Sequence, residues 1–144
     1  MATINKASAT VNAPSFGLDR IYWEEAIVGQ GAAAPIIQAP VLQSGSPPGS
    51  ALISGITRTS TGVYVVTLYQ SFFARIYSSF DIDDSAGIGS YGTLGNWTNL
   101  NTNLPVTVTL RTWNASGSTP TDIPLNTTGM FAAAFKGSYT GSVA

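Results

Sequence analysis

The chain has 144 residues, enough for one domain with a sizeable core, and contains no cysteine and no histidine. Disulfides, thiolate nucleophiles, histidine-ligated zinc and imidazole acid–base catalysis are therefore excluded. Only 9% of residues are charged against 44% hydrophobic, with a net charge of -1, so we expect no footprint for nucleic acid. Such a weakly charged surface is typical of one that contacts copies of itself or a larger assembly.

Residues 1–15 are small and polar, with Ile4 and Val11 as the only large aliphatic side chains. This composition cannot offset the entropy cost of ordering the backbone on the chain's own domain. We expect an extended N-terminal arm that is either disordered or, in an assembly, lies along a neighbour with Ile4 and Val11 at the interface. One β-sandwich domain follows over residues 16–144. Because the chain has neither the apolar segment of a signal peptide nor a span long enough for a bilayer, we expect no export and no membrane partner.

The first half of the domain contains one clear strand signal. Residues 18–28 alternate as a strand does, although Glu24, Glu25 and Ala26 also favour a short helix. Residues 35–42 are extended, but Pro40 confines them to a sheet edge or to the outside of the sheet. The loops 29–34 and 43–50 flank that segment.

The densest run of β-branched and aromatic residues lies between positions 61 and 80. Residues 51–59 and 63–69, joined by a turn at Gly62, predict a hairpin. Both faces of the second strand are largely apolar, so we expect something to cover both of them, either a second layer of the chain or a neighbouring subunit. The core residues predicted here are Tyr64, Val66 and Leu68.

The next segment is expected to contain a helical turn followed by an extended stretch. Phe72, Phe73 and Ile76 have the spacing of one helical face, which predicts a helical turn over residues 70–75. Residues 77–83 are expected to be extended.

Residues 84–105 are rich in Gly and Asn and predict a long loop. A loop of this length that carries large side chains is expected to make contacts, and the expected interface residues are Tyr91, Trp97 and Leu100. Tyr91, Trp97 and Trp113 can also form a stacking platform for sugar rings.

The last two predicted strands cover residues 106–113 and 130–135. In the first, Val108 and Leu110 share the core face with Val106; in the second, Phe131 and Phe135 face the core together. The alanines of the last strand allow another layer to approach closely. Strands at this spacing, divided by Gly, Pro and Asn turns, predict an all-β antiparallel sandwich, jelly-roll-like, in a single domain.

Asp81, Asp83 and Asp84 are the best metal candidates, since alternating carboxylates before a Gly-rich loop can converge on a hard cation. The EF-hand pattern fails because Ser85 and Ala86 replace its acidic residue and glycine. We therefore expect Asp81 and Asp83 to face water, and we expect no metal and no other cofactor.

Glu24 and Glu25 are adjacent carboxylates. On a strand their side chains point to opposite faces, which is poor geometry for a glycosidase pair. The Gly-rich stretch likewise lacks the Lys-Ser or Lys-Thr that a phosphate-binding loop requires. We expect no enzymatic activity.

The order of these segments resembles small structural proteins of tailed bacteriophages, of the capsid decoration or cement type. The resemblance covers about residues 50–136 and rests on strand and turn patterns. In that type a Gly-x-Tyr-x-Val-x-Leu strand, here Gly62, Tyr64, Val66 and Leu68, precedes a strand that ends in a small-residue turn and an Asp, here Asp122.

The resemblance implies a β-sandwich, frequently trimeric, that lies on capsid junctions and stabilises the shell without catalysis. Its partners would be the major capsid protein and copies of itself. The protein would be made in the host cytoplasm and would then lie on the capsid surface of the virion. Two other functions stay open: a tail or fibre module that binds host-surface glycan through Trp97 and Tyr91, and a secreted carbohydrate-binding module, which the missing signal peptide disfavours.

Overall fold

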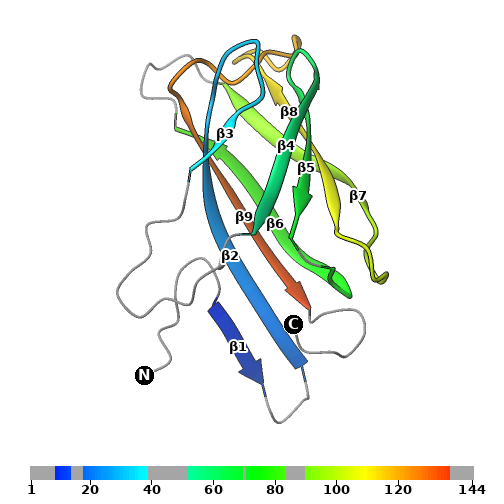
Figure 1. The fold of residues 1–144 in the computed structure, drawn as a ribbon. Helices are drawn as coiled ribbons and strands as arrows, with labels where there is room; N and C mark the ends of the chain where they lie inside the picture. The colour runs from blue at the N-terminus through cyan, green and yellow to red at the C-terminus, as the bar shows by residue number, and fades with distance from the viewer. Residues whose placement is uncertain (1–8, 14–17, 39–51, 70, 84–89, 137–144) are drawn as a thin grey trace.

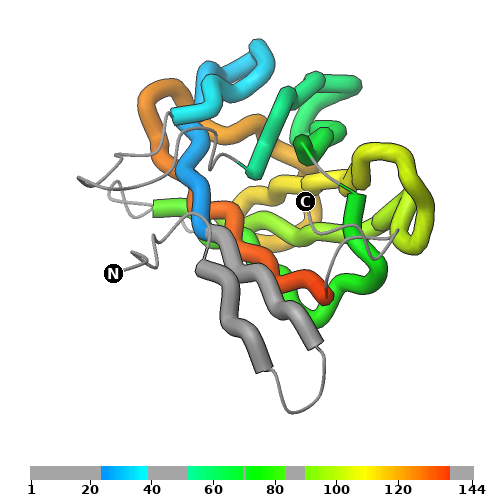
Figure 2. The backbone as a smooth tube through the Cα atoms, turned by 60° about the horizontal axis from the view of Figure 1, so that its bottom comes forward, coloured from blue at the N-terminus to red at the C-terminus, as the bar shows by residue number. Residues whose placement is uncertain are grey.

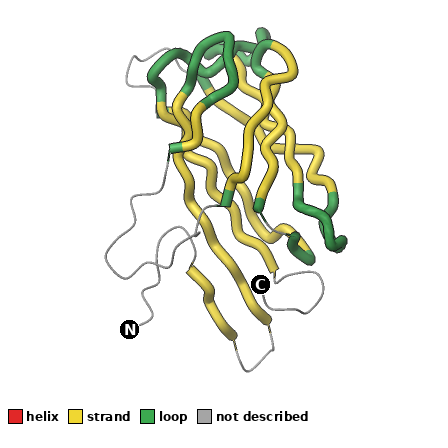
Figure 3. The backbone as a smooth tube through the Cα atoms, in the orientation of Figure 1, coloured by secondary structure: helices red, strands yellow, loops and turns green. Residues whose placement is uncertain are grey.

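The structure is a computed structural model that describes residues 9–13, 18–38, 52–69, 71–83 and 90–136. All regular secondary structure in these ranges is β-strand, and they contain no helix (Figure 3). The strands are β1 (Ala9–Ala13), β2 (Leu18–Val28), β3 (Ile36–Ile37), β4 (Ile53–Ser60), β5 (Val63–Leu68), β6 (Ala74–Ile82), β7 (Tyr91–Thr98), β8 (Thr107–Trp113) and β9 (Thr128–Lys136).

These strands form two antiparallel sheets (Figure 1). The first sheet has the order β1-β2-β9-β6, with β3 also paired to β2, and the second has the order β4-β5-β8-β7. Figure 2 shows β9 lying between β2 and β6 in the first sheet. Each sheet turns one apolar face toward the other, and the core lies between them. The predicted all-β antiparallel sandwich is confirmed.

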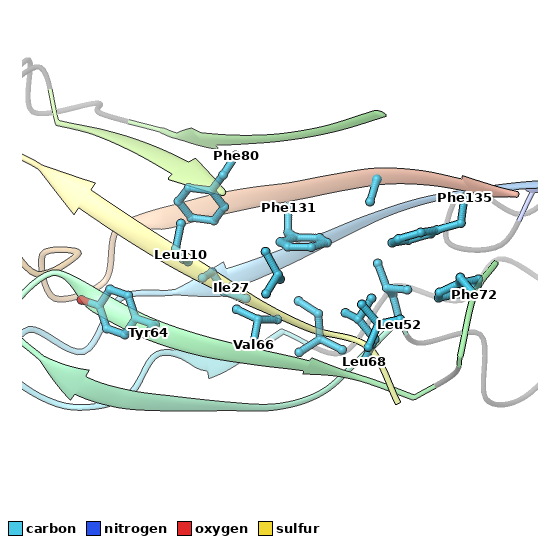
Figure 4. Close-up of a cluster of buried hydrophobic side chains, with 14 of the residues drawn as sticks. Ile27, Leu52, Tyr64, Val66, Leu68, Phe72, Phe80, Leu110, Phe131 and Phe135 are labelled. Atoms are coloured by element: carbon cyan, nitrogen blue, oxygen red, sulfur yellow. The ribbon is translucent and has the colours of Figure 1, made fainter. Parts of the chain in front are cut away.

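Alternation along the central strands places the core residues. Every second residue of β5 and of β8 is buried, and the odd-numbered residues of β9 face the same core. Phe72 stacks on Phe135 with ring centroids 4.0 Å apart. The seven residues predicted to form the core all lie in it, most of them labelled in Figure 4: Tyr64, Val66, Leu68, Val108, Leu110, Phe131 and Phe135.

Only one face of β5 is fully buried. Tyr64, Val66 and Leu68 point into the core, whereas the residues between them, such as Val63 and Val65, are half-buried. The expectation that something covers both faces is thus wrong for the single chain. β5 is central in its sheet, but the second layer lies on one side of it.

The segment before β6 is not helical. Phe72 is buried and Phe73 is exposed, so these two side chains do not share the face that their spacing predicted. Ile76 is also exposed, at a register shift between Arg75 and Tyr77. The predicted helical turn is wrong because Phe72 is held by its stack on Phe135 and the strand begins two residues later.

The predicted long loop contains β7, which pairs with β8. Its glycines suggested a loop, but Gly92 serves the packing of the strand on the core. A Cβ there would approach the Cδ2 atom of Phe80 to 2.4 Å, so no larger residue fits under that ring. Residues 84–89, which include Asp84, lie outside the described residues.

Part of the predicted arm is a strand of the chain's own sheet. β1 pairs with β2, and Val11 stands opposite Arg20 in the register. The hydrogen bonds of a strand pair use the backbone and do not depend on side-chain type. Composition alone therefore wrongly predicted that this segment finds no partner in its own domain. Figure 1 shows β1 and the first half of β2 extending past the ends of β4 and β5. Ile4 lies outside the described residues.

The edge strands are irregular and the central pairs are regular. β4, β6 and β7 each have at least one register shift against their neighbours. β2 pairs with β9 over nine consecutive positions and β5 pairs with β8 over five. The other edge, along β2, is shared by the short strands β1 and β3.

Candidate functional site

The side of the first sheet that is turned away from the second sheet, called here the outer face, is the first candidate interaction surface. On β9 the even-numbered residues point to this face, because the odd-numbered ones face the core. The register places neighbours from β2 and β6 on either side of them. The described members of the outer face are Glu24, Ala26, Val28, Tyr77, Ser79, Asp81, Thr128, Met130, Ala132, Ala134 and Lys136.

On β9 the middle of the outer face is formed by small side chains. Two larger apolar side chains are exposed on the same face, Tyr77 by 50% and Met130 by 40%. Between them Ala132 and Ala134 have side chains that end at the methyl group, so another surface can approach the backbone closely. Ala132 is already shielded, with 7% of its surface exposed.

Charge is unevenly distributed along the outer face. Lys136 lies at one end, with its Nζ 5.3 Å from the centroid of the exposed Phe73 ring. Glu24 is the register partner of Ala132 in the middle of the face, and Asp81 is the register partner of Met130. Asp83 lies at the other end, where its backbone N–H donates to the carbonyl of Thr128 (2.8 Å). A partner with the opposite order of charges would fit this face.

The second sheet presents a different outward side. Its residues there are mainly threonine and valine, with one cation: Val63, Val65, Thr67, Thr93, Thr107, Thr109 and Arg111. At one end of this side Tyr91 and Trp113 are register partners on neighbouring strands. Tyr91 is 42% exposed. This is a hydroxyl-rich surface with an aromatic pair at its end.

The structure separates the predicted interface residues. Tyr91 is exposed, but the ring of Trp97 packs against Phe131 and Phe135, with centroids 6.4 and 5.8 Å apart. Leu100 also packs against the core. Trp97 and Leu100 are therefore partly used by their own domain, and Trp97 does not join Tyr91 in an exposed platform.

The predicted metal candidates are only partly described. Asp81 and Asp83 are both exposed, as the solvated-face interpretation expects. In the described ranges, no group of three His, Cys, Asp or Glu residues is close enough to hold a metal ion.

Asp122 lies in the crossing between β8 and β9 and accepts four hydrogen bonds. Its donors are Arg58 Nε (3.0 Å) and Nη2 (2.8 Å), the backbone N–H of Gly62 (2.9 Å) and the hydroxyl of Tyr64 (2.9 Å). The Tyr64 hydroxyl in turn accepts a bond from the backbone N–H of Ile123 (3.0 Å). Asp122 thus ties the β4–β5 hairpin to the crossing segment.

The protonation states of Asp122 and Tyr64 suit the hydrogen bonds that they make. The hydrogen bonds from Arg58 hold the pKa of Asp122 below its ordinary value, even though burial opposes this. Burial is the main reason that the pKa of Tyr64 rises to about 12, so its hydroxyl stays protonated and can donate. Gly62 has φ of +66°, which favours glycine, and its N–H points at the carboxylate. This network is structural and offers no unused acid or base.

Glu25 is the other bridging carboxylate. As expected for a strand, Glu24 points outward and Glu25 inward, opposite Phe131. Its Oε2 accepts the backbone N–H groups of Leu52 (2.7 Å) and Ile53 (2.9 Å) at the start of β4. The second oxygen, Oε1, has no hydrogen-bond partner. Burial raises the pKa of Glu25, and the two N–H donors offset this only in part.

Comparison with known proteins identifies no relative: no family model, no curated protein and no solved structure matches this chain. Among the described residues there is no helix that is long and apolar enough to cross a membrane.

Proposed function

We propose that this protein is a non-enzymatic structural component of a phage virion, a capsid decoration protein that binds the shell through the outer face of its first sheet. The observation that carries the proposal is the composition of this face: the exposed Tyr77 and Met130 lie beside small alanine side chains, with Lys136 at one end and carboxylates next to Ala132 and Met130. Small and apolar side chains let two surfaces pack closely, and charged groups beside them fix the orientation of a partner.

The composition of the chain supports a structural role. With no histidine or cysteine the chain has no imidazole or thiolate for catalysis, and with 9% charged residues it is suited to contact with protein over much of its surface. The major capsid protein is the proposed partner, and copies of the chain on neighbouring capsid sites supply further contacts, a trimer being the arrangement that the resemblance implies.

Two matched variants test the proposal. Met130→Glu replaces an exposed apolar side chain of the outer face with a charge, and Thr109→Glu adds the same charge to the outward side of the second sheet. Both sites lie on strand surfaces, so both proteins should fold. In co-sedimentation with undecorated capsids, Met130→Glu should bind at least about tenfold more weakly than the natural protein, whereas Thr109→Glu should bind normally. Equal binding by both variants, or absence of the protein from purified virions, would exclude the proposal.

A second candidate function is glycan binding at the aromatic pair. The specific observation is that Tyr91 and Trp113 are register partners on one outward surface, beside the exposed Arg111. Aromatic faces stack on sugar rings and neighbouring polar groups orient them. Under this function, Tyr91→Ala and Trp113→Ala should abolish retention on immobilised host-surface polysaccharide, while Tyr77→Ala on the other sheet should leave it intact. No retention of the natural protein would remove this candidate.

A further inference from the structure

Glu25 combines complete burial with incomplete hydrogen bonding. It is 2% exposed, and its two oxygens have very different surroundings. Oε2 accepts hydrogen bonds from the N–H groups of Leu52, just before β4, and Ile53, its first residue, so the side chain connects β2 in the first sheet to the start of β4 in the second. Oε1 is buried without any partner. A carboxylate has about four acceptor sites, and an ionised group in this position leaves half of them unsatisfied.

No cation in the described chain faces Glu25. On β9 the residue opposite is Phe131, and at the start of β4 the neighbours are Leu52 and Ile53. The charged groups of the packed elements whose side chains are described point elsewhere. Glu24, Asp81 and Lys136 lie on the outer face, Arg58 is at the far end of β4 on Asp122, and Arg75 lies over the Trp97 ring.

We propose that Glu25 is a proton-controlled latch between the two sheets, closed when the carboxyl is neutral and weakened when it is ionised. In the neutral form, Oε2 remains a carbonyl-type acceptor for both N–H groups and the buried site holds no charge. In the ionised form, a charge lies in the core without a cation, and the start of β4 must move to let water reach Oε1. Burying an unpaired charge is costly, and local opening relieves that cost.

The pH direction follows from the same geometry. Because burial raises the pKa of Glu25 above its value in the unfolded chain, the folded protein holds this proton more tightly. The contribution of Glu25 to stability is therefore fully present below the ordinary pKa of 4.5 and is lost as pH rises through the folded value. The latch tightens in acid and loosens toward neutral pH.

The test uses the full chain and two NMR measurements between pH 4 and pH 8. The carboxyl carbon of Glu25 should titrate with a midpoint above 4.5, and over the same range the amides of Leu52 and Ile53 should lose at least about tenfold in exchange protection. This loss is counted after correction for the intrinsic pH dependence of exchange. The amides of Val66 and Val108, in the central strands, are the internal controls and should keep their protection.

The matched variant is Glu25→Gln, which keeps an oxygen for both N–H groups and cannot ionise. Its Leu52 and Ile53 amides should show no such loss, and its Tm should not fall between pH 4 and pH 8. A Glu25 midpoint at or below 4.5 would overturn the proposal, as would the same amide behaviour in the variant and the natural protein. If Glu25→Gln does not fold, the titration of the natural protein still decides the question.

Discussion

Two carboxylates connect distant parts of this sandwich, and they differ in their burial and in their hydrogen-bond partners. Asp122 accepts the guanidinium of Arg58 together with a backbone N–H and a hydroxyl, whereas Glu25 accepts two backbone N–H groups and meets no cation. The pKa of Asp122 is lowered and that of Glu25 is raised. At Glu25 the two N–H donors offset only part of the effect of burial, whereas at Asp122 the guanidinium and the further donors outweigh it.

The contacts made by Asp122 and by Glu25 also respond differently to protonation. The join around Asp122 needs the ionised form, and the join around Glu25 is strongest in the neutral form. One molecule thus contains one contact that acid weakens and another that acid strengthens.

The largest expected effect comes from Asp122→Ala. It leaves Arg58, the N–H of Gly62 and the hydroxyl of Tyr64 without their acceptor, so the free energy of unfolding should fall by about 3 kcal/mol. Urea denaturation followed by Trp fluorescence measures this. A change below about 0.5 kcal/mol would mean that the network is incidental to stability.

The variant Asp122→Asn separates the pH dependence of stability that is due to Asp122 from the part that is due to Glu25. Because the pKa of Asp122 is lowered in the folded state, its contribution is present above 3.8, the ordinary value, and is lost as pH falls through the folded value. The natural protein should therefore lose stability in strong acid, and this loss should be smaller in Asp122→Asn. The fall toward neutral pH, which belongs to Glu25, should be the same in both proteins. Unfolding curves from pH 2 to pH 8 test both statements.

A smaller effect is expected for Tyr64→Phe. The change removes the hydroxyl that donates to Asp122 and accepts from the N–H of Ile123, while the buried ring stays. The cost should be about 1 to 2 kcal/mol, measured by the same denaturation. In the Asp122→Ala background the cost should shrink, because one of the two hydrogen bonds is already gone.

The smallest effect is expected for Asp81→Asn, since Asp81 is exposed. Its stability should stay within about 0.5 kcal/mol of the natural protein. Adding calcium should not raise the Tm of either protein, and calorimetry should find no stoichiometric site. A calcium-dependent rise in Tm that Asp81→Asn abolishes would restore the metal hypothesis.

The strands were predictable where side chains alternate and pack, as in β2, whose bounds match the predicted residues 18–28. β7 was missed because Gly92 and Gly95 lower strand propensity, and the reason for Gly92 is the ring of Phe80, which is distant in sequence. The helical turn was wrongly predicted because spacing alone does not reveal that Phe72 stacks on Phe135.

The sequence predicts one part of the outer face, the alternation along β9, but not the neighbours that β2 and β6 supply. The alternation of Met130, Ala132 and Ala134 against Phe131 and Phe135 can be read from the sequence of β9 itself. The position of Glu24 and Asp81 beside Ala132 and Met130 could not be, because it depends on the register of β9 with β2 and β6, which are far away along the chain. Asp122 was noticed only through a resemblance, since its partner Arg58 is 64 residues away.

The irregular edges of both sheets bear on what happens when many copies are crowded together. A regular edge strand offers a row of free N–H and C=O groups to which another chain can add, and such addition has no natural end. Here β4, β6 and β7 are interrupted by register shifts, and the remaining edge is divided between the short strands β1 and β3. Addition of a strand from another chain is therefore disfavoured at each edge of the described sheets. Crowded copies should meet through side-chain surfaces, as closed contacts, and should resist growth into fibrils.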